Sequence, residues 1–216
     1  MFGMTPATMH LVRENLFADG WPVEGSGVRR WSGPAAADYL RAYRRRAYRT
    51  ERIPVLDRSL YQIEYHYGEG SCCAVHPVIH DTSRSFVLAY DDICLGQVGF
   101  DLTQADVGPH AVVSQIQGTR YVTEHNGRVT GAEGPAKSVS WQPALLNLLV
   151  AAAPLVGASR VVVRPHTSSR YRKIQNNWFG NAHRLYDGTA QSCGFTYDSE
   201  GRAWTMATAA TAGGVP

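Results

Sequence analysis

Residues 140–165, "SWQPALLNLLVAAAPLVGASRVVVRP", decide the fold class of the chain. Apolar side chains fall on nearly every face of a helix that should begin at Ser140, its N-cap, and end at Gly157, so we expect this helix to be buried. Residues 159–165 follow as a short apolar strand. Because residues 110–122, before the helix, are also strand-like, we expect two parallel strands joined by a right-handed crossover.

Four strand-like segments precede this helix. Residues 59–67 alternate apolar and polar side chains, which is the period of a strand with one buried face. The other three segments are residues 85–92, 93–102 and 110–122. Asp91 and Asp92 fit a hairpin turn between the first two of these three. The pattern predicts antiparallel strands that lead into the parallel pair.

Two helices are expected at the N-terminal end of the chain. The first follows Thr5-Pro6, a good N-cap and first-turn pair, and ends at Gly20. The second begins at residues 32–34 and runs to about Arg49. Helices that pack on the faces of a mixed sheet give an α/β fold with both antiparallel and parallel strands.

The length of 216 residues suits a single domain. We expect this domain to span residues 1–206, with a helical N-terminal part over residues 1–52 and a mixed-sheet core over residues 59–206. The small residues of the last segment, 207–216, predict a disordered tail.

The charge, the cysteines and the apolar runs of the chain indicate its compartment and its partners. The formal net charge is only +3, so no global electrostatic argument for nucleic acid follows. The four cysteines form no disulfide framework and no secretory signal precedes them, so we expect free thiols in the cytoplasm. No apolar run is long enough to span a membrane, and no membrane partner is expected.

Residues 41–52 are an exception to this low net charge, because they form a strongly basic segment. Its arginines alternate with tyrosines, a composition that suits phosphate, tRNA or an acidic partner. The arginines concerned are Arg41, Arg44, Arg45 and Arg49. The other interpretation is a solvated helix face whose long stems cover the core.

A glycine-rich loop at residues 123–139 enters the apolar helix. Free backbone N–H groups and the helix dipole make such a junction an anion site. The candidate cofactor-binding residues are Arg128, Gly131, Gly134, Lys137 and Ser140. The loop matches neither the P-loop nor the dinucleotide fingerprint, so a flexible surface loop is the alternative.

Two amides mark the strand before this loop. Gln115 and Gln117 should share one strand face with Val113, while Ser114 and Ile116 share the other. Buried amides need partners, so this pair would either bind a substrate amide or carboxyl group or satisfy neighbouring backbone at the strand end.

A metal site is not expected. Cys72, His76 and His80 share one face of an extended segment, but the rise per residue would put the two histidines roughly 13 Å apart. No fourth ligand clusters with them in the sequence.

Polar residues follow the last apolar strand, at the sheet edge where ligands of open α/β sheets bind. They are Arg164, His166, Lys173, Tyr186 and Asp187. His166 fits a general base and Tyr186 a general acid. In the structural alternative, Asp187 pairs locally with Arg184 and Tyr186 belongs to the core.

Residues 85–206 resemble the VirK/YbjX group of bacterial proteins. The shared features are a strand ending in Gln-Gly, a long apolar helix, a strand with a His-containing loop, and a Tyr-Asp pair six residues before a Gly pair. The matching positions are Gln117–Gly118, the helix from Trp141, His166, Tyr186–Asp187 and Gly194, with Phe195 in place of the second glycine. No biochemical role follows from this resemblance.

The element order is also similar to the GCN5-related N-acetyltransferase fold. The chain keeps "N-A-x-x-L-Y" from Asn181 to Tyr186 and then Gly194-Phe195. The chain departs from this fold in two ways. The spacing from Tyr186 to Gly194 is one helical turn longer than usual, so Ala190 stands at the usual tyrosine position. The usual Gln/Arg-x-x-Gly-x-Gly/Ala loop is absent from the sequence.

This resemblance implies transfer of an acyl or aminoacyl group to an amine of a small molecule or peptide. An acyl-CoA or an aminoacyl-tRNA would lie against the loop at 123–139, Gln115 and Gln117 would orient the acceptor, and His166 or Tyr186 would move protons. The alternative is a non-catalytic protein on the same fold that binds a small molecule or tRNA.

Overall fold

The computed structural model describes residues 6–22, 24–43, 58–68, 82–106, 108–118, 135, 138–168 and 182–208. The helices are α1 (Pro6–Leu16), α2 (Gly33–Arg41), α4 (Trp141–Ala152) and α6 (Thr189–Ser192). The shorter turns are η2 (Arg58–Leu60), η4 (Ala153–Val156), η5 (His166–Ser168) and η7 (Arg184–Gly188). The strands are β1 (Gly27–Ser32), β2 (Tyr61–Tyr67), β3 (Arg84–Tyr90), β4 (Ile93–Ala105), β5 (Gly108–Gly118), β6 (Arg160–Val163), β7 (Thr196–Asp198) and β8 (Ala203–Ala207).

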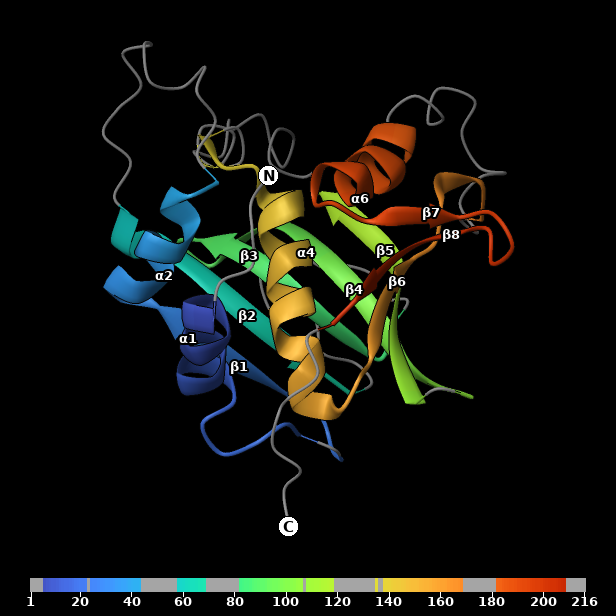
Figure 1. Ribbon diagram of the computed structural model, residues 1–216. Coiled ribbons are helices and arrows are strands. Elements are labelled where there is room, and N and C mark those ends of the chain that lie inside the picture. Colours follow the sequence, from blue (N-terminus) through green and yellow to red (C-terminus); the bar gives the residue numbers. More distant parts are fainter. Residues whose placement is uncertain are drawn as a thin grey trace.

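One eight-stranded mixed sheet organises these elements, in the order β1-β2-β3-β4-β5-β6-β8-β7 (Figure 1). Neighbouring strands are antiparallel except β5 and β6, which are parallel and joined through α4. The structure therefore confirms an α/β fold with a mixed sheet, the antiparallel strands before the apolar helix, and the parallel pair around it.

Helices α1, α2 and α4 lie on the same side of the sheet (Figure 1). Helix α4 is buried almost throughout, as its sequence predicts, and it packs against α1, α6, β3 and β4. Its first residue, Trp141, lies over Gly96 and Gly118, which face each other across β4 and β5. A Cβ at Gly96 would lie 2.7 Å from the indole ring and a Cβ at Gly118 would lie 3.2 Å from it, so the absence of a side chain, above all at Gly96, makes room for Trp141.

The opposite face of the sheet carries polar side chains that are nevertheless buried. Strand alternation separates Ile63 and Tyr65, which join the core beneath the helices, from Glu64 and His66 on the other face. The buried polar residues of strands β2 to β5 are Glu64, His66, Ser85, Gln97 and Gln115. A period-2 pattern predicts which residues share a face, but it does not predict that the polar face is buried.

The N-terminal part differs from the expected helical segment. Residues 27–32 form strand β1, which pairs with β2 and places Trp31 in the core. Only this one large apolar side chain points inward from the short strand, too weak a pattern for a strand prediction. Helix α2 ends at Arg41 with a turn at Ala42 and Tyr43, so the expected continuation toward Arg49 is wrong at these two positions.

The tail begins later than expected, because its first two residues are held by the sheet. Ala207 belongs to β8, and Thr208 donates a backbone hydrogen bond to the carbonyl of Ser159. The hairpin turn between β3 and β4 is confirmed at Asp91 and Asp92, whose φ angles of 50° and 59° suit a type I′ turn.

The packing of Trp141 against Gly96 and Gly118 gives a prediction on stability. In Gly96→Ala, the new Cβ would lie 2.7 Å from the Trp141 ring, closer than carbon atoms approach each other, so we expect the free energy of unfolding to fall by about 1–3 kcal/mol. Gly118→Ala is the matched control, because its Cβ would lie 3.2 Å from the same ring and require a smaller adjustment. Urea unfolding measures both variants, and a Gly96→Ala protein no less stable than Gly118→Ala would contradict this packing.

Candidate functional site

Strands β5 and β6 separate halfway along β5. They pair from His110–Arg160 to Val113–Val163, and the backbone N–H of Arg164 donates the last hydrogen bond to Val113 at 3.0 Å. β5 continues for five more residues, to Gly118, without pairing to β6. Ligands of open α/β sheets bind at such carboxyl ends of strands, and the site is built at this point.

Tyr186 fills the opening between the two strands. The backbone N–H of Ile116 donates to the Tyr186 hydroxyl at 3.1 Å, and the hydroxyl lies 3.4 Å from the carbonyl of Ser114, to which it can donate. The side chain is only 2% exposed. The tyrosine thus supplies to β5 the kind of hydrogen bonds that a neighbouring strand would make. Its ring belongs to the core, as in the structural alternative.

A β-bulge at the same point changes the faces of β5. The register shifts so that Val113 opposes Phe100 while Gln115 opposes Gly99, which leaves Ser114 as the extra residue. Val113 and Ile116 therefore share the core face, and the expectation that Gln115 lies on the face of Val113 is wrong. Strict alternation fails wherever a bulge inserts a residue.

His166 and Asp187 meet beside this opening. His166 follows β6, and its ring Nδ1 lies 2.6 Å from Asp187 Oδ2, which also accepts the His166 backbone N–H at 3.1 Å. Trp204 on β8 donates its indole N–H to Asp187 Oδ1 at 2.9 Å. Both carboxylate oxygens are thus engaged, and the structure brings together two of the three residues expected to be catalytic.

The chemistry of this dyad follows from the charge of Asp187. Burial raises the pKa of Asp187, but hydrogen bonds from Trp204 and from the backbone and ring of His166 lower it, and the net pKa lies below its usual value. An ionised carboxylate only accepts hydrogen bonds, so the His166 proton must be on Nδ1. The neutral ring then presents Nε2 as a base, the arrangement of a general-base histidine held by a carboxylate.

The helix that carries Asp187 has a wide turn and a glycine end. Residues 184–188 form the π-helical turn η7, which precedes α6. Phe195 N–H donates to Ala190 and Gly194 N–H to Gln191, both at 3.0 Å, with Gly194 at φ 88°. This is a Schellman ending, which confirms the glycine stop expected from the sequence. π-turns of this kind occur frequently at functional sites.

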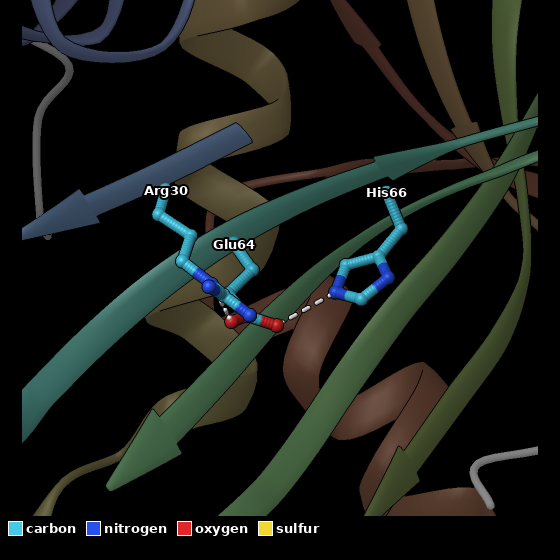
Figure 2. A network of polar contacts seen from close by, with 3 residues as sticks. All are labelled: Arg30, Glu64 and His66. Carbon is cyan, nitrogen blue, oxygen red and sulfur yellow. Dashed lines mark hydrogen bonds and ion pairs between the residues drawn. The ribbon is translucent and has the colours of Figure 1, made fainter. Parts of the chain in front are cut away.

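A second polar network lies on the other face of the sheet (Figure 2). Arg30 Nε donates to Glu64 Oε1 at 2.8 Å, and His66 Nε2 lies 2.7 Å from Glu64 Oε2. Burial raises the pKa of Glu64, but His66 and Arg30 lower it to below the usual value. The sequence did not predict this network, because Arg30 comes from the unrecognised strand β1 and the alternation in β2 gives no sign that its polar face is buried.

The remaining predicted residues are distributed around these two networks. Gln115 donates its amide N–H to Gln117 Oε1 at 2.9 Å, on the face opposite to α6. The Arg164 side chain is exposed. Ser140 is the N-cap residue of α4, as expected, but its side chain makes no capping hydrogen bond. The Ser140 backbone N–H donates to the carbonyl of Tyr43 at 2.8 Å.

Several predicted residues lie outside the described residues. These are Arg44, Arg45, Arg49, Cys72, Cys73, His76, His80, Arg128, Gly131, Gly134, Lys137 and Lys173. Within the described ranges, Cys94 and Cys193 are buried and neither forms a disulfide. No helix in the described part of the chain has the length and apolar character needed to cross a membrane.

The Tyr186 hydroxyl gives a second prediction. Tyr186→Phe would leave the buried Ile116 N–H without this acceptor, so we expect a loss of about 1–3 kcal/mol in the free energy of unfolding and faster amide exchange at Ile116. Tyr197→Phe, at a tyrosine 46% exposed on β7, is the control and should be nearly neutral. Unchanged exchange at Ile116 would show that the hydroxyl does not protect this group.

Asp187 gives a third prediction, on pH dependence. Its folded-state pKa lies below the unfolded value of about 3.9, so the stabilisation it provides is present above that pH and is lost as the pH falls through the folded pKa. Urea unfolding between pH 6 and pH 2 should therefore show a shallower loss of stability for Asp187→Asn than for the wild type. Asp19→Asn, at an exposed carboxylate, controls for loss of charge. Equal slopes for Asp187→Asn and the wild type would contradict the assignment.

Comparison of the chain with protein-family models, curated proteins and solved structures finds no match.

Proposed function

We propose that the protein is an acyltransferase-like enzyme that transfers an acyl or aminoacyl group to an amine of a small molecule or peptide. The observation that carries the proposal is the contact between His166 and Asp187 at the point where β5 and β6 separate. A histidine whose Nδ1 is held by a buried carboxylate is suited to remove a proton from an amine. The carboxylate also stabilises the imidazolium that forms.

The proposed reaction needs one base and one activated carbonyl. The acceptor nitrogen attacks the carbonyl of a thioester or ester donor, and His166 Nε2 takes the proton that the nitrogen loses. The new C–N bond forms as the C–S or C–O bond breaks, and the proton passes to the leaving thiolate or alkoxide. The Tyr186 hydroxyl is engaged with the backbone of β5, so the proposed role of Tyr186 is to position the neighbouring Asp187.

The order of elements supports the resemblance to the GCN5-related N-acetyltransferase fold. Two N-terminal helices and antiparallel strands lead to a strand–helix–strand unit and a helix that ends in Gly194-Phe195. The extra strand β1 and the π-turn η7 are departures from the expected order and spacing. They fit a divergent member of that fold, for which the proposed donor is an acyl-CoA or an aminoacyl-tRNA.

The non-catalytic alternative would use the basic segment for tRNA. Of its arginines, Arg41 lies in the described part of the chain, and its guanidinium forms an ion pair with the Asp38 carboxylate one turn earlier in α2. The Asp38 carboxylate offsets the positive charge that Arg41 could offer to a phosphate. The His166–Asp187 contact, which a tRNA-binding protein would not need, favours the enzyme.

The fourth prediction tests the base. Acetyl-CoA, longer acyl-CoAs and aminoacyl-tRNA are each incubated with the protein and a panel of amines, and release of thiol or free tRNA is followed. With the donor that reacts, His166→Gln should lower the rate by about 10²–10⁴-fold, because the proton acceptor is lost. His10→Gln, at an exposed histidine of α1, is the matched control and should retain the wild-type rate.

Three outcomes separate the alternatives. Transfer that depends on His166 supports the enzyme. Thermal stabilisation by tRNA alone, which weakens steeply with salt and without any transfer, supports the binding protein. No stabilisation by any CoA or tRNA, and no transfer, contradicts both.

A further inference from the structure

A second histidine contacts the dyad. The ring centroid of His183 lies 5.1 Å from that of His166, and the two imidazole planes are nearly perpendicular, at 80°. His183 is the residue before the π-helical turn η7, and Asp187 follows within that turn. The helix of residues 182–192 therefore brings both a carboxylate and a second imidazole to His166.

The two imidazoles differ in their surroundings. The His166 side chain is only 18% exposed, and Asp187 accepts hydrogen bonds from its ring and from its backbone N–H. The His183 side chain is exposed to solvent. Two neighbouring titratable groups in different environments are a common arrangement of an acid and a base in enzymes. A ring held by a carboxylate suits the base, whereas an exposed ring, which can exchange protons with water, suits the acid.

We propose that His183 is the general acid of the transfer reaction and that the acyl donor is an oxygen ester. The inference rests on the proposed function, in which His166 is the base. The attacking nitrogen and the leaving oxygen are bonded to the same carbon in the tetrahedral intermediate, so the base and the acid must lie close together. The contact between the two rings meets this requirement.

The two histidines complete the proton balance of the reaction. The acceptor nitrogen forms its bond to the carbonyl carbon, and His166 Nε2 takes the proton that this nitrogen loses. The C–O bond of the ester then breaks, its electron pair stays on the leaving oxygen, and protonated His183 donates a proton to that oxygen. His166 passes its proton to His183, directly or through water, which restores the starting state. The net products are an amide and an alcohol.

A second imidazole favours an ester donor over a thioester donor. A thiolate is a weak base that leaves readily as an anion, so a thioester needs little help from an acid. An alkoxide is a much stronger base, and it leaves slowly unless it is protonated as the bond breaks. Of the two proposed donors, aminoacyl-tRNA is an oxygen ester and acyl-CoA is a thioester. The His166–His183 pair therefore favours the aminoacyl ester.

The test compares two esters of one amino acid, phenylalanine ethyl ester and phenylalanine p-nitrophenyl ester, at millimolar concentration with glycinamide as the acceptor. Ethoxide needs a proton in order to leave, whereas p-nitrophenolate is a stable anion. In His183→Gln we expect amide formation from the ethyl ester to slow by about 10²-fold, and amide formation from the p-nitrophenyl ester to change by less than about threefold. His166→Gln should slow the reaction of both esters, because both need the base.

Two controls separate this role from a structural one. His10→Gln, at an exposed histidine of α1, should leave both rates unchanged. His183→Gln should unfold at nearly the same urea concentration as the wild type, because the side chain that it replaces is exposed.

The outcomes distinguish this inference from the proposed function. An equal effect of His183→Gln on the two esters, no effect on either, or no acceleration of either ester by the wild type would overturn the role of His183. If His183→Gln alone has no selective effect while His166→Gln slows both esters, the proposed function stands and only the general acid is lost. Transfer that is unchanged in His166→Gln would contradict the proposed function and, with it, the assignment of His183.

Discussion

The separation of β5 from β6 after Val113 is the constraint on which the site depends. A strand that loses its neighbour exposes backbone groups, and inside a core these groups need other partners. Tyr186 provides them through one hydroxyl. This contact holds the helix of residues 182–192 against β5, and the next residue, Asp187, then reaches His166 and Trp204. The dyad is therefore a consequence of how the fold satisfies its own backbone.

In the Arg30–Glu64–His66 network, on the other face of the sheet, buried polar groups are likewise satisfied by partners within the protein. A buried carboxylate is tolerated when its oxygens are paired, and each oxygen of Glu64 faces one partner (Figure 2). Arg30 and Glu64 are also direct cross-strand partners of β1 and β2. A slip of one residue would turn Arg30 to the helix side, so the ion pair favours the observed register of the edge strand. The arginine side chain is mostly exposed, which keeps its charge in contact with water.

The sequence predicted those parts of the molecule in which one pattern dominates. The apolar run of α4, the alternation in β2 and the glycine stop at Gly194 are local signals, and the structure confirms them. Strand β1 and the bulge at Ser114 arise from pairing with distant strands, and no local pattern encodes them. The same holds for the site. His166 and Asp187 were identified from their place after a strand and on a helix, whereas Trp204, which fixes the second carboxylate oxygen, could be found only in three dimensions.

The central claim is that Asp187 holds the His166 proton on Nδ1 and leaves Nε2 as the base. Nitrogen-15 NMR of the imidazole rings measures this directly, with His166→Gln used to assign the signals. The account predicts that, when neutral, His166 has a protonated Nδ1 coupled to Asp187 and an unprotonated Nε2. A neutral ring with its proton on Nε2 would contradict it.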